Sequence, residues 1–252
     1  MFKKEGFGTK LRQTRKDHKL SQFDFVSQLA NSHKEFAALS QTTLSLWENG
    51  KREPSFLRRI AIARFFAEGY EMSEQEKKFV SKTKATEVGA RPSFYPVSIT
   101  DIVIIDYTHL SQKQADVVSQ GHEHFYSEPL AETMAAFSAS HYSVSLLMNE
   151  NAIVGHYISN NAGLIVSFCF IDNSVAFKMV LDLDGKFSSV VLPTRTPAIA
   201  SFFQDLHFEP YPTVSRIKFY KGNLKDLYKN PFFKDLLNNN ADLVRFSKAQ
   251  KG

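Results

Sequence analysis

Cysteine is nearly absent from this chain of 252 residues, which carries a single one, Cys169. One thiol excludes an intramolecular disulfide framework and any cysteine-rich zinc or iron–sulfur site. Long apolar runs are absent too, since no stretch reaches the roughly 18 apolar residues that a membrane-spanning helix needs. The first residues, MFKKEGFGTKLRQTRKDHK, lack the apolar segment of a secretory signal. We therefore expect a cytoplasmic protein without a membrane segment.

Signatures of common catalytic sites are also lacking. The sequence contains no Walker phosphate loop, no G-x-S-x-G and no H-E-x-x-H motif. His122, His124 and Glu128 are of metal-binding type, but side chains two positions apart on a helix point about 200° away from each other. We expect a solvated helix end there, and a buried, unreactive Cys169 among its apolar neighbours. We expect no catalytic residues, no metal and no cofactor.

The composition and the charge distribution describe what is present. Apolar residues make up 43% of the chain and charged residues 23%, which is typical of a globular protein and excludes disordered and collagen-like classes. Residues 1–88 carry 17 Lys/Arg against 11 Asp/Glu, a balance of +6, and residues 89–252 carry 14 against 15, a balance of −1. A basic part beside a near-neutral part is expected when one domain binds a polyanion. An ordinary solvated surface gives the same balance, so the motifs have to decide.

A change of pattern divides the chain. Up to about Lys84, apolar residues recur at steps of three and four, which predicts helices over about residues 5–18, 21–30, 40–48, 55–68 and 73–85. Gly89, Pro92 and Pro96 then interrupt the pattern, and a run of strand type begins at Ile102. We predict an all-α domain over residues 1–85, a linker over 86–96 and a second domain over 97–252.

The second domain is predicted to alternate strands and helices. The expected strands are 99–107, 142–149, 152–159, 163–171, 187–193 and 211–220, and the expected helices are 111–125, 128–140, 173–184 and 196–206. This pattern indicates the α+β class, with a mixed sheet flanked by helices. Two further helical segments, broken near Pro231, carry apolar residues that either pack on their own domain or form a two-fold interface.

The third predicted helix, residues 41–48, is short, with clear signals at both ends and two distinct stripes. Ser40 is a good N-cap, and Gly50 supplies the left-handed conformation in which a helix often ends. Leu44 and Trp47 lie on one stripe and are expected to pack inward. The opposite stripe carries Gln41, Thr42, Ser45 and Leu46, which are able to contact base edges in a major groove. A small helical bundle that binds another protein is the alternative.

Residues 7–68 resemble a known family through three segments in order: LRQTRKDHK, then LSQ…SQTTLSLWENGKREPS, then LRRIAIARFF. They are similar to the lambda-repressor/Cro-type helix-turn-helix, also called the xenobiotic-response-element family. The resemblance implies a DNA-binding surface made of Gln22, Gln41, Thr42, Thr43, Ser45, Leu46, Asn49, Lys51 and Arg52. The segment between Gln22 and Gln41 is about eight residues longer than is usual in the family, and its extra residues either lengthen the first helix or contact the phosphate backbone.

The second domain resembles the GCN5-related N-acetyltransferase fold through AIVGHYI and TPAIASFFQDLHFEP, although His207 stands where that family commonly has glycine. An active member binds the pyrophosphate of acetyl-CoA with a glycine-rich loop at a helix N-terminus. Here DNSVA follows the strand LIVSFCFI, and no glycine occurs until Gly185. The resemblance therefore implies an acetyltransferase-like fold without acetyl transfer, that is, not an enzyme.

Together these features predict a sequence-specific transcriptional regulator, a homodimeric repressor that binds a two-fold operator in double-stranded DNA. Its second domain would dimerise or sense a small-molecule effector, whose binding residues the sequence does not identify. Two alternatives remain open: an acetyltransferase that a helix-turn-helix domain brings to its target, and an antitoxin or phage-immunity regulator that binds a protein partner.

Overall fold

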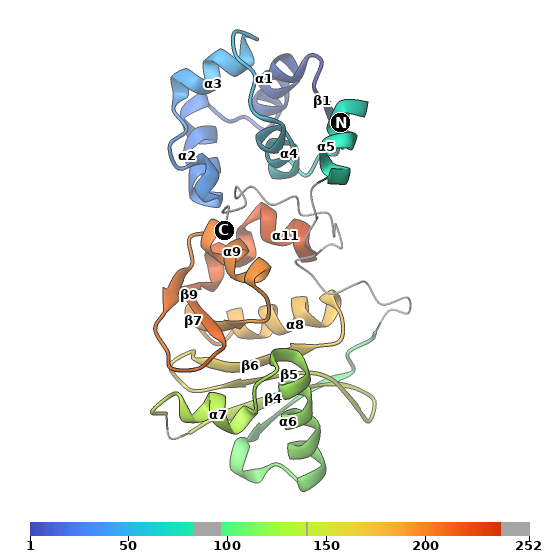
Figure 1. Cartoon of the computed structure of the whole chain (residues 1–252), viewed down its shortest axis with the longest axis vertical. Helices are drawn as coiled ribbons and strands as arrows, with labels where there is room; N and C mark the ends of the chain where they lie inside the picture. The colour runs from blue at the N-terminus through green and yellow to red at the C-terminus, as the bar shows by residue number, and fades with distance from the viewer. Residues whose placement is uncertain (83–96, 140, 238–252) are drawn as a thin grey trace.

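The computed structural model describes residues 1–82, 97–139 and 141–237, which form an N-terminal helical unit (1–82) and a C-terminal unit of sheets and helices (97–237) (Figure 1). The chain is thus of mixed α and β content, as predicted. The predicted linker, residues 86–96, lies outside the described residues.

All five helices predicted in the N-terminal unit are present. They are α1 (Phe7–Asp17), α2 (Gln22–Ser32), α3 (Gln41–Glu48), α4 (Phe56–Phe65) and α5 (Glu74–Lys82). A 3₁₀ turn, η1 (Lys34–Phe36), follows α2, and strands β1 (Phe2–Lys3) and β2 (Tyr70–Glu71) form a short parallel pair. That pair was not predicted, because a two-residue strand carries no hydrophobic period.

Close packing fixes α1 against α3. Leu11, Leu44 and Trp47 are buried in the core of the N-terminal unit. Gly8 permits the contact, because a Cβ added at Gly8 would come 2.1 Å from the carbonyl oxygen of Trp47. The backbone of α1 therefore lies directly against the last turn of α3.

The C-terminal unit contains two antiparallel sheets. The first has the order β3 (Asp101–Asp106), β4 (Ser143–Asn149), β5 (Ala152–Ser159) and β6 (Ile165–Phe170), and the second has the order β7 (Ser189–Thr194), β9 (Lys218–Asn223) and β8 (Glu209–Tyr211). A parallel bridge between Leu164 and Val191 joins them. The strand predicted at 211–220 is wrong: Ser215 makes a turn by donating its N–H to Thr213 Oγ1 and accepting that of Ile217, so β8 and β9 are separate.

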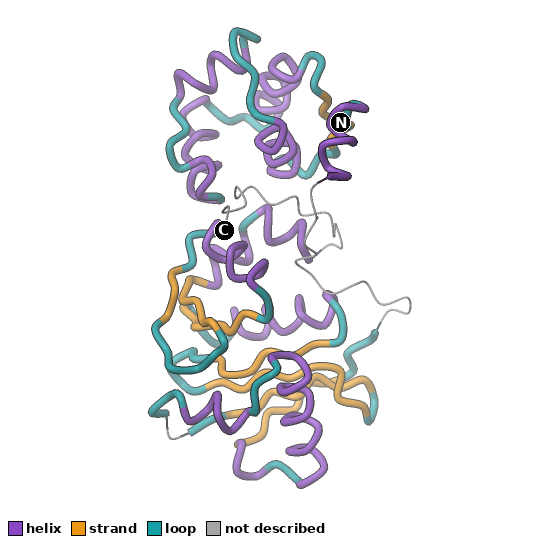
Figure 2. The backbone as a smooth tube through the Cα atoms, in the orientation of Figure 1, coloured by secondary structure: helices purple, strands orange, loops and turns teal. Residues whose placement is uncertain are grey.

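Helices cover both faces of the four-stranded sheet (Figures 1 and 2). The 3₁₀ turn η2 (Tyr107–His109), α6 (Gln112–Tyr126) and α7 (Leu130–Ala135) lie on one side, with α7 shorter than the predicted 128–140. Helix α8 (Asn173–Asp184) lies on the other side. Helices α9 (Pro197–Asp205), α10 (Leu224–Lys229) and α11 (Pro231–Leu237) lie between the sheets and the N-terminal unit.

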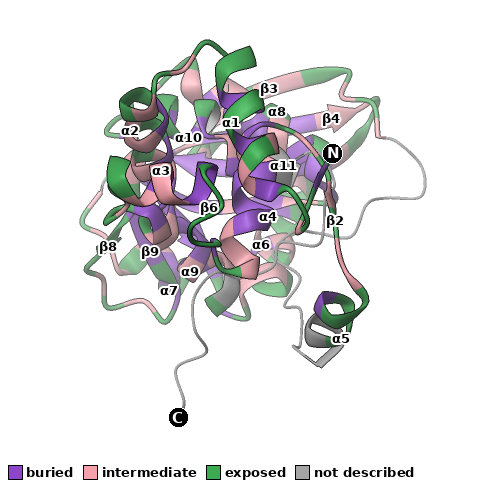
Figure 3. Ribbon diagram, turned by 90° about the horizontal axis from the view of Figure 1, so that it is seen from above, coloured by how far each residue is buried: buried purple, intermediate pink, exposed green. Residues whose placement is uncertain are grey.

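Four apolar residues of α10 and α11, the last helices of the described residues, pack within the chain. Leu224, Leu227, Phe232 and Phe233 have exposed fractions of 0–5%, and Figure 3 shows buried residues along α4 and α11 where these helices meet. The packing is intramolecular but not confined to their own domain as one alternative had it, because α11 contacts α4 of the N-terminal unit as well as α8. These four side chains are therefore not available for a two-fold interface.

Candidate nucleic-acid interface

Helix α3 begins with the predicted cap. The Oγ of Ser40 accepts the backbone N–H of Thr43 at 3.1 Å and lies 3.0 Å from the Thr43 hydroxyl. The cap engages Thr43, whereas Gln41 and Thr42 are exposed in the first turn. Two polar side chains at the helix start thus face solvent.

The buried stripe predicted for α3 is confirmed, whereas the opposite stripe is only partly exposed. Leu44 and Trp47 are 0% and 2% exposed, and both belong to the core of the N-terminal unit. Ser45 and Leu46 are half-buried on the other side of the helix. In Figure 1, α3 lies near the end of the molecule remote from the sheets, so the C-terminal unit does not cover this surface.

The end of α3 positions two basic residues, Lys51 and Arg52. The N–H of Gly50 donates to the Trp47 carbonyl at 3.1 Å, and the N–H of Lys51 donates to the Leu46 carbonyl at 3.0 Å. With φ of 68° at Gly50, this is the Schellman arrangement that ends a helix sharply. Lys51 and Arg52 follow at once and are exposed.

A buried ion pair fixes α3 to α1, and sequence reasoning missed it. Arg15 donates from Nε to Glu48 Oε1 at 2.6 Å and from Nη2 to Glu48 Oε2 at 2.9 Å. The side chains of Arg15 and Glu48 are 8% and 1% exposed. Burial raises the pKa of the Glu48 carboxyl, but the hydrogen bonds from Arg15 and Gln22 outweigh it and hold that pKa below its ordinary value. Each partner lies four residues after a buried leucine, Leu11 or Leu44, which is the signal that could have revealed the pair.

Gln22 joins the same cluster from α2. It is the first residue of that helix and donates from Nε2 to Glu48 Oε2 at 2.8 Å. Ser21 caps the helix in a capping box with Asp24. The side chain of Gln22 is thereby held against the C-terminal end of α3, and its predicted contact with a phosphate stays a prediction.

The long segment between the two predicted DNA-facing helices contacts the C-terminal unit. Helix α2 ends at Ser32, and the extra residues around His33 to Phe36 form the separate turn η1 instead of lengthening the helix; their expected contact with the phosphate backbone stays a prediction. His207 Nε2 donates to the Ala30 carbonyl at 2.9 Å, and Asn230 Nδ2 donates to the Ser32 carbonyl at 2.8 Å. Carbonyls of the last helical turn have no partner within their own helix. Side chains of the C-terminal unit therefore complete the end of α2.

The expectation of a solvated helix end at His122 is wrong. His122 is fully buried, with Nδ1 at 2.9 Å from Ser167 Oγ and Nε2 at 3.0 Å from Thr133 Oγ1. His156 Nε2 lies 3.0 Å from the same Ser167 hydroxyl. The error arises because the last turns of α6 pack on β6, which the local sequence does not reveal. In the described ranges, no group of three metal-ligating side chains is placed to hold an ion.

Burial sets the protonation of these groups. It lowers the pKa of His122 to about 4 and that of His156 to about 3, so both imidazoles are neutral near pH 7. Cys169 is buried, as predicted, and burial raises the pKa of its thiol to about 12.

Acid is expected to destabilise the fold through His122. The unfolded chain binds more protons than the folded chain between pH 6.5 and 4, so the free energy of unfolding falls as the pH decreases through this range. The glutamine of His122→Gln does not titrate. The free energy of unfolding of this variant, measured in urea, should therefore fall by about 2 kcal/mol less than that of the parent between pH 6.5 and 4.5. The control His124→Gln alters an exposed histidine of the same helix and should behave like the parent. Equal losses in the parent and His122→Gln would contradict this account.

No protein-family model, curated protein or solved structure matches this chain. Within the described residues, no helix is long and apolar enough to cross a membrane. We therefore infer function from the α3 surface, which consists of Gln41, Thr42, Ser45 and Leu46, and from what these residues are able to bind.

Proposed function

We propose that the N-terminal unit is a helix-turn-helix DNA-binding domain of the lambda-repressor/Cro type, and that the protein is a sequence-specific transcriptional repressor. The observation that carries the proposal is the α3 surface. Gln41 and Thr42 are exposed at the start of a helix whose start, end and buried face are all fixed by contacts. Rigid presentation of a few polar side chains is what base recognition requires.

The side chains of this surface have the chemistry of base readout. A glutamine such as Gln41 pairs bidentately with the N6 and N7 atoms of adenine in the major groove. Thr42 and Ser45 are able to hydrogen-bond several bases, and Leu46 is able to contact a thymine methyl group. Asn49, Lys51 and Arg52 are exposed directly after α3 and carry donors suited to phosphate oxygens.

Loss of a phosphate contact should act on all DNA sequences alike. We expect Lys51→Ala and Arg52→Ala each to weaken binding to specific and random duplexes equally, and to reduce the slope of log K against log salt by about one. The measurement is a titration at several salt concentrations, with Lys178→Ala, an exposed lysine of α8, as the control. If a variant kept the full slope, the lysine or arginine that it replaces would not contact the DNA phosphates.

The C-terminal unit is proposed to be an acetyltransferase-like domain that dimerises the protein or senses an effector. The start of α8 does not fit the pyrophosphate of acetyl-CoA. Asp172 caps this helix by accepting the N–H of Val175 at 3.0 Å, and its carboxylate also accepts from the Ser174 hydroxyl at 2.6 Å. A carboxylate therefore occupies the position at which a phosphate would have to bind. This supports a regulatory role for the domain.

The proposal is tested by selection from random duplexes with the full chain. One recognition helix contacts about half a turn of DNA, so a dimer is expected to select two half-sites related by a two-fold axis about one helical turn apart. Enrichment of such a motif would support the proposal. Recovery of no motif, with binding that depends only on salt, would overturn it.

A further inference from the structure

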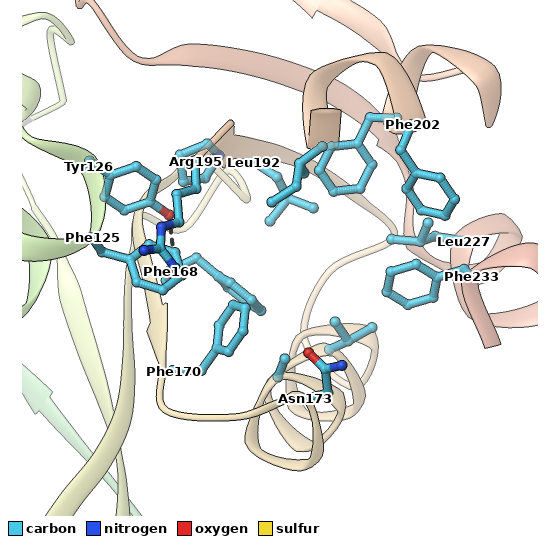
Figure 4. Close-up of a pocket in the computed structure, with 15 residues that line it drawn as sticks. Phe125, Tyr126, Phe168, Phe170, Asn173, Leu192, Arg195, Phe202, Leu227 and Phe233 are labelled. Atoms are coloured by element: carbon cyan, nitrogen blue, oxygen red, sulfur yellow. Dashed lines mark hydrogen bonds between the residues drawn. The ribbon is translucent and has the colours of Figure 1, made fainter. Parts of the chain in front are cut away.

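An apolar pocket lies between the two sheets of the C-terminal unit (Figure 4). Strand β6 and helix α8 form one wall, and β7 with α9 forms the other. The cavity has a volume of about 90 Å³ and is lined mainly by aromatic and aliphatic side chains. An apolar cavity of roughly 150 Å³ holds benzene in another protein, so the enclosed part of this pocket holds a few carbons of a ligand, and the rest of a longer tail would lie in its open part.

Arg195 lies at one end of this pocket. It is the only charged residue among those described that line the cavity, and its guanidinium lies 4.5 Å from the ring centre of Phe125. The Tyr126 hydroxyl donates to the Phe168 carbonyl at 2.9 Å and is thereby engaged. No carboxylate of the described residues lies within ion-pair distance of Arg195. A cation at the end of an apolar cavity is complementary to a small apolar anion.

The opposite end of the pocket leads toward the N-terminal unit. Figure 4 shows Leu227 and Phe233 across the cavity from Arg195. The neighbour of Phe233 is Phe232, whose ring lies edge-on to that of His33 at 5.0 Å. A ligand that contacts Phe233 therefore touches the chain neighbour of Phe232, which itself packs on His33 of the N-terminal unit.

Helix α9 makes a second connection. Phe202 and Phe203 line the pocket, and the same helix ends next to His207, which donates to the Ala30 carbonyl of α2. Asn230, which begins α11, donates to the carbonyl of Ser32. The two helices that close the pocket therefore also hold the end of α2.

We propose that this pocket binds a small carboxylic acid with an apolar tail, and that binding changes the affinity for DNA through α9 and α11. The carboxylate pairs with Arg195, and the tail extends toward Leu227 and Phe233. The second half of this inference rests on the proposed DNA-binding function. An alcohol lacks the charge that Arg195 complements, and an amine would be repelled.

Binding is tested by calorimetry on the full chain with octanoate, octanol and octylamine. Octanoate should bind with one site per chain, and octanol at least tenfold more weakly. Arg195→Met should weaken octanoate binding at least tenfold, whereas Arg216→Met, an exposed arginine outside this pocket, should leave it unchanged. Equal affinity for octanoate and octanol, or full affinity in Arg195→Met, would overturn the assignment.

Coupling is tested by measuring affinity for the selected duplex with and without saturating octanoate. We expect a change of at least fivefold, and by linkage the duplex should change octanoate affinity by the same factor. Asn230→Asp keeps the oxygen that caps α11 but loses the donor to Ser32. It should retain octanoate binding and lose most of the coupling. Full coupling in Asn230→Asp, or none in the parent, would overturn the role of α11.

The two proposals fail in different ways. Octanoate binding without a selected duplex would overturn the DNA-binding function and leave the pocket assigned. A selected duplex without octanoate binding would overturn the pocket alone.

Discussion

Glu48→Ala is expected to lower the free energy of unfolding by about 3–5 kcal/mol, because it leaves the Arg15 guanidinium buried without its partner. Arg15 would keep only the Leu20 carbonyl, to which Nη1 donates at 2.7 Å. Gln22 would lose its acceptor as well, so the contacts that join α1, α2 and α3 at one carboxylate would disappear together. Urea unfolding at pH 7 measures the effect.

Two variants separate the buried charge from a general effect of the substitution. Glu5→Ala alters an exposed glutamate of the same unit and should change stability by less than about 0.5 kcal/mol. Arg15→Met combined with Glu48→Leu removes both charges and should recover most of the loss, since apolar residues often replace a buried pair at little cost. If Glu48→Ala lowered the free energy of unfolding by less than about 1 kcal/mol, the Arg15–Glu48 pair would not be buried as described.

Gln41→Ala combined with Thr42→Ala is expected to abolish sequence-specific binding. Each good base contact contributes about 1–3 kcal/mol, so losing two costs about 2–6 kcal/mol, or roughly 30-fold to 10⁴-fold in affinity. Both side chains are exposed, so the fold should be unchanged. Fluorescence anisotropy at constant salt would measure affinity for the selected duplex and for a random one, and only the first should fall.

The matched control substitutes the same residue types elsewhere. Thr108→Ala with Gln112→Ala alters exposed residues of the C-terminal unit and should leave both affinities unchanged. If the α3 double variant bound the selected duplex as tightly as the parent, α3 would not be the recognition helix.

Local signals were sufficient to predict much of the N-terminal unit. Ser21 and Ser40 cap α2 and α3 as expected, because a cap needs only the hydroxyl and the N–H groups three positions on. Gly50 ends α3 for the same kind of local reason. The burial of Leu44 and Trp47 and the exposure of Gln41 and Thr42 also followed from the sequence period of α3, whereas the half-burial of Ser45 and Leu46 did not.

Features that depend on distant residues could not be predicted in this way. The partners Arg15 and Glu48 are 33 positions apart, and each looks like a surface charge within its own helix. His122 looked solvated because its partner Ser167 is 45 positions away. The pocket near Arg195 also combines several separate stretches of the chain, so no single segment carries its pattern.

The most direct test of the central claim places single purine analogues in the selected duplex. Replacing adenine with 7-deaza-adenine removes the major-groove N7 atom, whereas 3-deaza-adenine removes the minor-groove N3 atom. We predict that a 7-deaza-adenine in each half-site weakens binding of the parent at least fivefold, yet causes no further loss for Gln41→Ala. Binding that is insensitive to every 7-deaza substitution, or sensitive only to 3-deaza substitutions, would contradict a recognition helix in the major groove.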